Sequence, residues 1–355
     1  MWKKFNLVLL ICPILIFSLS YITLLSTSEE RARTHLGFFL IGLAFYILFA
    51  FIDYKIYQTY WKPIYIATVV LLALTYIAGQ IKFGASRWFS VAGVAFQPAE
   101  FAKITTIIVM STIIAQNKYI YGNFRTIKEN ILKFIGLAAL ALPLIILVFL
   151  QPDLGTAVTL LAVVVSMLYY SGVNKIYFLI AILIFGILSA PAWNILRDYQ
   201  KQRILIFLNP ALDTQGSGYN VVQSIIAIGS SGIFGKGFGN GTQTHLNFLP
   251  AYWTDFIFAS YAEEWGLIGI IMALTLYLTL ISTLIYVAYK GKNAAASLIV
   301  IGIFTIFFVQ LVINIGMNLG IMPVKGIPLP LFSYGGSSMI STMIMLGLAQ
   351  NICRE

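Results

Sequence analysis

The stretch LVLLICPILIFSLSYITLL, residues 7–25, carries no charged side chain and is close to the ~20 apolar residues that a helix needs to cross a bilayer. A signal peptide would have a shorter apolar run and a small-residue cleavage site, so we expect a retained first span. Similar runs recur along the 355 residues, which are 60% hydrophobic and only 10% charged. Soluble domains usually carry about 25% charged residues. The composition therefore predicts a polytopic membrane protein.

The apolar runs predict an all-α fold of about ten transmembrane helices in a single membrane domain, residues 1–355. Lys and Arg gather in the loops on one side, and the positive-inside rule places that side and both termini in the cytoplasm. The net charge of +10 then reflects topology and attraction to membrane lipids, so nucleic acid is not an expected partner. Cys12 and Cys353 form neither a disulfide framework nor a metal cluster. The expected spans centre on 7–26, 35–53, 62–79, 98–116, 132–150, 154–171, 175–195, 256–288, 295–321 and 334–351.

One long loop, residues 197–254, is expected on the outer side between the seventh and eighth spans. Loops of this length are usually functional or disordered. Aromatic residues and the apolar segment YNVVQSIIAIGSSGIFG argue against disorder and indicate an amphipathic segment along the outer interface. Asp255 follows this loop at the mouth of the eighth span, in FLPAYWTDFIF. Its position suits a carboxylate that acts at the outer membrane surface.

Several other ionisable residues fall in or beside apolar runs, where they usually face a partner or a cavity. Glu100 and Lys103 are three residues apart on one helical face, and both a structural ion pair and a substrate role stay open. Asp153 stands at a break between two spans, where an N-cap carboxylate is expected. Glu263 and Glu264 are adjacent, so they should point in different directions.

The outer loops also carry cations, which runs against the positive-inside rule. Guanidinium groups suit phosphates because they offer paired donors in one plane. Anchoring to lipid headgroups is the alternative explanation. Sequence motifs for phosphate loops, zinc proteases and serine hydrolases are missing. The outer residues in question are Arg87 beside Trp88, Arg197, Lys201, Arg203, Lys236 and Lys325.

Six stretches in the same order resemble the SEDS family (shape, elongation, division and sporulation) over nearly the whole chain. They are FGASRWFSVAGVAFQPAEFAKI, QPDLGTA, RDYQKQRILIFLNP, GSGYNVVQSIIAIGSSGIFGKGFGNGTQTHLNFLP, TDFIF with AEEWGLIG, and NIGMNLGIMPVKGIPLPLFSYGGSS. The wording of DYQKQRI and GTQTHLNFLP is more similar to the elongation member than to the division member. Ala251, Ala99 and Ser231 depart from the family pattern, and the first stands where relatives commonly have Glu.

The resemblance implies a peptidoglycan glycosyltransferase that polymerises lipid II, an undecaprenyl-pyrophosphate-linked disaccharide peptide, on the outer face of the bacterial cytoplasmic membrane. It also implies a partner, a single-pass class B penicillin-binding protein that cross-links the new strands. The family's essential aspartate falls on Asp255 and its functional tryptophan on Trp88. Its Glu–Lys pair falls on Glu100 and Lys103, and the acid of its QPDLGT motif on Asp153.

This chemistry fits the residue types. The acceptor hydroxyl needs a positioned base, and a partly desolvated carboxylate such as Asp255 can serve. The departing pyrophosphate needs positive charge, which Arg87, Lys103, Arg203 or Lys325 could contribute, and Trp88 could pack on a sugar face or the lipid. A divalent ion on the pyrophosphate stays an open alternative, although no ligand set indicates one.

Two other classes of function stay open from the sequence. A flippase or transporter of a lipid-linked sugar would also use the intramembrane residues Glu100, Lys103 and Asp153. A non-catalytic scaffold for a penicillin-binding protein would use small-residue helix faces near Gly316 and Gly320. A long outer loop that ends in an acid favours catalysis on one face, whereas a flippase needs access from both faces.

Overall fold

The structure is a computed structural model, and its helices cover every expected span except 175–195, most of which lies outside the described residues. Among the described residues, six helices are long and apolar enough to cross a membrane, so the number ten stays a prediction. The helices confirm an all-α membrane architecture. The structure describes residues 5–82, 85–91, 94–116, 127–180 and 216–355, together with 182–183, 186, 194, 201, 205–207, 209 and 213.

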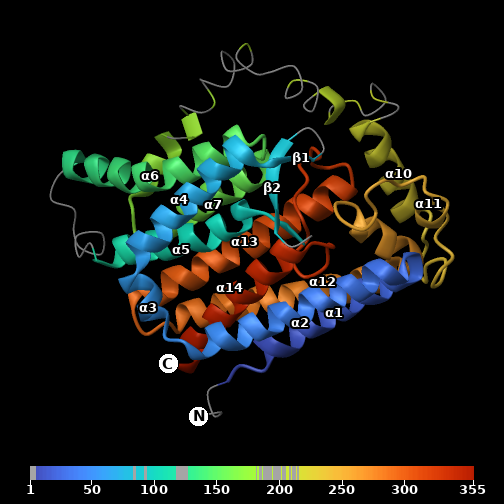
Figure 1. Cartoon of the computed structure of the whole chain (residues 1–355), viewed down its shortest axis with the longest axis horizontal. Coiled ribbons are helices and arrows are strands. Elements are labelled where there is room, and N and C mark those ends of the chain that lie inside the picture. The colour runs from blue at the N-terminus through green and yellow to red at the C-terminus, as the bar shows by residue number, and fades with distance from the viewer. Residues whose placement is uncertain are drawn as a thin grey trace.

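The helices pack as a bundle whose long axes run broadly in one direction (Figure 1). Both ends of the chain lie at one end of the bundle, and α10 and α11 lie at the opposite end. This arrangement agrees with two cytoplasmic termini and an outer 217–255 segment. The helices are α1 Val8–Thr27, α2 Glu29–Phe51, α3 Tyr54–Thr59, α4 Trp61–Ala78, α5 Pro98–Gln116, α6 Ile127–Leu150, α7 Leu154–Tyr170, α10 Ser217–Gly229, α11 Thr242–His245, α12 Ile257–Tyr289, α13 Ala294–Asn318 and α14 Gly336–Arg354.

The core lies around α5 and α13, which neighbouring helices enclose, whereas α4 turns most of its surface outward. Glycines allow two of the closest helix approaches. A Cβ at Gly302 of α13 would lie 2.7 Å from a side-chain carbon of Ile107 on α5. A Cβ at Gly347 of α14 would lie 2.6 Å from the carbonyl oxygen of Tyr46 on α2. Small residues at such contacts let helices approach closely in a membrane.

A small antiparallel sheet lies between α4 and α5, where the sequence analysis expected only an outer loop. Its strands are β1 Gln80–Lys82, β2 Ala85–Val91 and β3 Val94–Phe96, in the order β1-β2-β3. The hydropathy pattern identifies membrane spans, and this segment is too short to be one. Its short strands give only local signals, so the sheet was missed. In the sheet, Trp88 pairs with Gln80, and Phe89 pairs with Phe96.

The expected outer loop contains two helices in its described part. The apolar segment predicted to be ordered forms α10, which buries Val221, Ser224 and Ala227 and exposes Ile225 and Ile226. The hydroxyl group of Ser224 donates a hydrogen bond to the carbonyl oxygen of Asn318, 2.8 Å away. The amphipathic segment is therefore a helix that packs on the outer end of α13.

A kink in α12 explains how the outer segment attaches to the bundle. Gly266 has φ 63° and ψ −160° within the helix, a left-handed conformation that glycine accepts readily. The break frees the carbonyl oxygens of Glu263 and Glu264, which accept hydrogen bonds from the backbone N–H groups of Lys236 and Gly237, both at 3.0 Å. A Cβ at Gly266 would lie 2.2 Å from the backbone nitrogen of Gly235, so the backbones of these two segments touch directly.

Candidate active site

Asp255 lies in the turn immediately before α12, and its side chain is half-buried. Its carbonyl oxygen accepts hydrogen bonds from the amide groups of Asn314, at 3.2 Å, and Asn318, at 3.1 Å. Both asparagines are buried on α13 and are four residues apart, so they share one helical face. α13 therefore fixes the backbone that carries this carboxylate.

The segment before α14 fixes the residues on the other side of Asp255. The backbone N–H of Tyr334 donates to the carbonyl oxygen of Trp253 at 2.9 Å, and the hydroxyl of Ser333 donates to that of Thr254 at 2.7 Å. Gly326 has φ +62°, and a Cβ there would lie 3.6 Å from Oδ2 of Asp255. The carboxylate of Asp255 therefore faces the backbone around Gly326.

Lys325 stands next to this glycine and is half-buried. Burial lowers the pKa of the Lys325 ammonium from its ordinary value because desolvation disfavours the charged form. Among the described residues, no carboxylate oxygen lies within 4.0 Å of its Nζ. An anionic group bound beside Lys325 would favour its protonated form, so the residue can serve as a phosphate contact.

Asp153 lies 3% exposed at the N-terminus of α7 and caps it, as the sequence predicts. Its Oδ1 accepts from the backbone N–H of Thr156, and its Oδ2 accepts from the Thr156 hydroxyl and the Gln97 amide, all at 3.0 Å. A Cβ at the neighbouring Gly155 would lie 2.9 Å from the carbonyl oxygen of Lys325. The capped end of α7 thus packs against the segment that faces Asp255.

Glu100 and Lys103 form the ion pair that their spacing allows, with 2.7 Å between Oε2 and Nζ. Their side chains are 2% and 1% exposed on α5. Oε2 of Glu100 also accepts a hydrogen bond from the hydroxyl of Ser341 on α14, at 2.8 Å. The ion pair therefore links α5 to α14 in the buried interior of the bundle, and a substrate role for it stays a proposal.

Trp88 is half-exposed on β2. The sheet is followed by Gln97, whose backbone N–H donates to the hydroxyl of Ser337 on α14 at 3.0 Å. Arg87 lies on the same strand, but its side chain lies outside the described part of the structure. The other two predicted arginines, Arg197 and Arg203, lie outside the described residues. The structure thus brings Asp255, Lys325 and Asp153 to one segment and leaves the contribution of the three arginines a prediction.

The sequence analysis missed a cation at the outer end of α2. Nη1 of Arg31 donates a hydrogen bond to the Tyr252 hydroxyl at 2.9 Å, and its guanidinium carbon lies 3.9 Å from the centre of the Trp253 ring. The two aromatic residues that follow Ala251 therefore hold this guanidinium group. Asn314 and Asn318 were also missed, although two amides four residues apart in an apolar span are a recognisable signal.

The described residues contain no group of three or more His, Cys, Asp or Glu side chains that could hold a metal ion. Lys325 is a described cation beside the candidate site, and a divalent ion carried in by a pyrophosphate would bring its own oxygen ligands from that group.

The whole chain, residues 1–355, matches the family model of the FtsW, RodA and SpoVE cell cycle proteins. The chain belongs to this family. Peptidoglycan glycosyltransferase MrdB of Escherichia coli K12 is 35% identical over 99% of this chain and 94% of the relative. A probable peptidoglycan glycosyltransferase FtsW of Geobacter metallireducens is 32% identical over 99% of this chain and 95% of the relative.

Two solved structures share the fold over almost their full length. A chain of a peptidoglycan synthase complex that couples polymerisation and cross-linking has a TM-score of 0.87 at 29% identity, and covers 99% of this chain and 98% of its own. The rod shape determining protein RodA of Thermus thermophilus has a TM-score of 0.74 at 27% identity, with the same coverage. Family membership and the helical membrane fold expected from the sequence are both confirmed.

Proposed function

We propose that this chain is a peptidoglycan glycosyltransferase that polymerises lipid II at the outer face of the bacterial cytoplasmic membrane, with Asp255 as the base. The observation that carries the proposal is the setting of Asp255, a half-buried carboxylate whose backbone is fixed by α13. The carboxylate faces the backbone at Gly326, next to a half-buried lysine. The relatives' names, peptidoglycan glycosyltransferase MrdB and FtsW, support the same activity.

The reaction assigns separate tasks to these groups. Asp255 accepts the proton of the acceptor sugar hydroxyl as that oxygen attacks the anomeric carbon of the donor. The bond from that carbon to the pyrophosphate oxygen breaks, and the negative charge passes to the polyprenyl pyrophosphate. Lys325 stabilises this leaving group, with Arg87 and Arg203 as further predicted contacts. Trp88 packs against the sugar or the lipid, since an aromatic ring offers a flat apolar face.

The partner we propose is a class B penicillin-binding protein, and the process is cell elongation. A chain of a solved peptidoglycan synthase complex shares the fold, which supports such an assembly. The elongation role draws on similarity to a rod shape determining protein and to MrdB. Because FtsW proteins are comparably similar at 32% identity, a test in cells is required to separate the two roles.

The proposal is tested with purified protein, the class B partner and lipid II. Wild type should produce a ladder of glycan strands on a gel. In vesicles that hold labelled lipid II in one leaflet, the reconstituted protein should not speed translocation of lipid II relative to vesicles without protein. Translocation without polymer would instead establish a flippase. A partner that forms glycan strands equally well without this chain would reduce the chain to a scaffold.

A further inference from the structure

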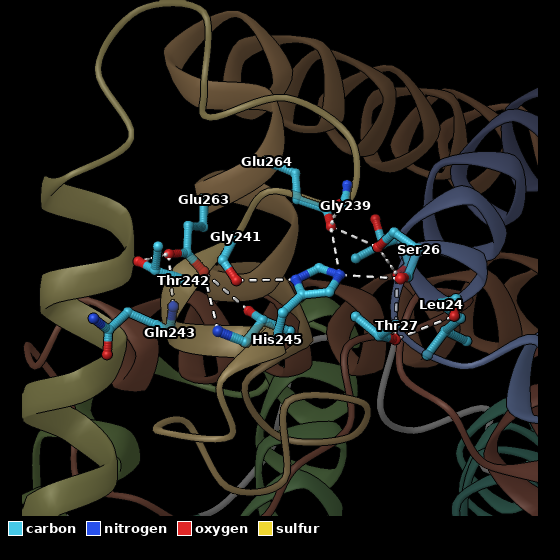
Figure 2. A network of polar contacts seen from close by, with 12 residues as sticks. Leu24, Ser26, Thr27, Gly239, Gly241, Thr242, Gln243, His245, Glu263 and Glu264 are labelled. Atoms are coloured by element: carbon cyan, nitrogen blue, oxygen red, sulfur yellow. Dashed lines mark hydrogen bonds and ion pairs between the residues drawn. The ribbon is translucent and has the colours of Figure 1, made fainter.

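His245, the last residue of α11, is surrounded by hydrogen-bond acceptors (Figure 2). Its Nδ1 lies 2.9 Å from the carbonyl oxygen of Gly241, and its Nε2 lies 3.0 Å from that of Ser26. The same Nε2 lies 3.9 Å from Oε1 of Glu264. Neutral imidazole has one N–H group and one lone pair, so it would direct a lone pair at a carbonyl oxygen. Both contacts are satisfied only when both ring nitrogens carry a proton.

Two neighbours favour this positive charge. Ser26 belongs to the last turn of α1, where unpaired carbonyl groups form the negative end of the helix dipole. Glu264 is fully buried on α12, and Oε2 of its carboxylate has no hydrogen-bond partner among the described residues. Its Oε1 accepts a hydrogen bond from the Ser26 hydroxyl at 2.5 Å. A buried carboxylate is stabilised by hydrogen bonds or by a nearby cation, and a protonated His245 would supply that cation.

The other charged groups at this junction are already paired. Glu263, on α12, forms an ion pair with Lys236, with 2.7 Å between Oε1 and Nζ. The carboxylate of Glu263 also accepts from the backbone N–H groups of Gln243 at 2.9 Å and Thr244 at 3.2 Å. Glu263 thus holds the start of α11, while His245 holds its end to α1 and Glu264 (Figure 2).

The chain that follows α11 leads directly to Asp255, the proposed base. The backbone N–H of Leu249 donates to the carbonyl oxygen of Gln243 at 2.9 Å, so the chain after α11 is tied back to it. Leu249, Tyr252 and Phe256 are buried in one apolar cluster, and Phe256 follows Asp255. A shift of α11 would therefore disturb the apolar cluster that packs on both sides of Asp255 in the chain.

We infer that His245 is a positioning residue for glycan polymerisation: its imidazolium ties α11 to α1 and α12 and so holds the segment that leads to Asp255. The inference rests on the proposed function. Loss of one ring proton replaces a hydrogen bond with a lone pair against a carbonyl oxygen and removes the charge beside Glu264. The outer segment then loosens, and polymerisation slows because misplacement of a base by about 1 Å can cost ~100-fold.

The protonation state is measured directly on wild type by ¹⁵N NMR of histidine-labelled protein in detergent, across about pH 5 to about pH 8, the range in which histidine changes charge. The chain has 2 histidines, and the spectrum of His245→Arg identifies the signal of His245 by its loss. We expect two protonated ring nitrogens where the protein is most active. A neutral ring at that pH would overturn the inference without any variant having to fold.

Activity is then compared among wild type, His245→Gln and His245→Arg. The Gln variant should polymerise lipid II more slowly, by up to ~100-fold, the loss expected when a base is misplaced by about 1 Å. Arg keeps the charge and several N–H donors, so it should restore most of the rate. The wild-type rate should fall over the pH interval in which the NMR signal changes, and the Arg variant should show no fall there.

Parallel pH profiles for wild type and His245→Arg would overturn the inference, as would a wild-type rate in a folded Gln variant. If Gln prevents folding, the Arg profile and the NMR titration decide. A wild type that forms no glycan at all contradicts the proposed function instead. In that case the clamp is tested by limited proteolysis of the 232–255 segment, which should become faster as the ring loses its proton and would refute the clamp if it did not.

Discussion

Two lysines on different parts of the molecule show how burial can serve structure or function. Lys103 is 1% exposed on α5 and lies 2.7 Å from the carboxylate of Glu100, three residues away in the same helix. Lys325 is half-buried beside the outer segment that faces Asp255, and no carboxylate lies within 4.0 Å of it among the described residues. A cation with a built-in partner stabilises a fold, whereas one that is desolvated without such a partner is available to a ligand.

Lys236 is an intermediate case. It forms an ion pair with Glu263 at 2.7 Å but is itself 24% exposed, and its partner lies 27 residues away in the chain. Glu263 also receives backbone and hydroxyl hydrogen bonds from the start of α11. We therefore expect the loss of stability on substitution to decrease from Lys103 to Lys236 to Lys325. The effect on substrate binding should increase in the same order.

Removal of Lys103 should have the largest effect on stability. Lys103→Ala leaves the Glu100 carboxylate buried without its cation, which should cost about 3–5 kcal/mol. Thermal unfolding in detergent, followed by tryptophan fluorescence, measures the loss. The exchanged pair Glu100→Lys with Lys103→Glu should recover folding more fully than activity. Equal melting temperatures for Lys103→Ala and wild type would show that the ion pair contributes nothing.

Removal of Lys236 should have a smaller effect. Lys236→Ala deletes one charged partner of Glu263, but the N–H groups of Gln243 and Thr244 remain, so the loss should be about 1.5 kcal/mol. Hydrogen exchange of the 236–245 segment should increase more than that of α5. Uniform destabilisation of both regions would contradict a local role in holding the outer segment.

Removal of Lys325 should have the smallest effect on stability, and this effect should have the opposite sign. Burial lowers its pKa in the folded state, so folding opposes its charge at every pH below that folded pKa, and the penalty disappears above the unfolded value. Lys325→Met should therefore leave the melting temperature unchanged or raised at neutral pH, while KM for lipid II increases. A lower melting temperature with unchanged KM would make Lys325 a structural residue.

The sequence predicts contacts between residues close in the chain better than contacts between distant segments. The Glu100–Lys103 pair and the Asp153 cap follow from spacings of a few residues, and both are present. The β1–β3 sheet and the contact of Arg31 with Trp253 were missed, because they depend on strand pairing and on segments more than 200 residues apart. Burial of both Glu263 and Glu264 also required the kink at Gly266, for which a lone glycine in an apolar run is a weak signal.

The role of Asp255 itself was drawn from its place in the chain and from family resemblance. Its setting adds that α13 holds its backbone through two amides and that its carboxylate faces Gly326. Neither contact could be read from the sequence, since the segments involved are about 60 to 70 residues away. A base held this firmly should tolerate little change in length, so Asp255→Glu should also lose most of the rate.

The most direct measurement is gel-resolved lipid II polymerisation with the class B partner, by wild type, Asp255→Asn and Asp53→Asn. Asp53 is a matched control because it caps α3 at the end of the bundle that holds both termini (Figure 1), at 2.9 Å from the Lys55 backbone nitrogen, and Asn caps a helix about as well as Asp. Asp255→Asn keeps the shape of the side chain and removes its basicity. We expect no glycan ladder from Asp255→Asn, despite normal folding and partner binding, and a wild-type ladder from Asp53→Asn. Ladders of equal intensity from Asp255→Asn and wild type would contradict the assignment of Asp255 as the catalytic base.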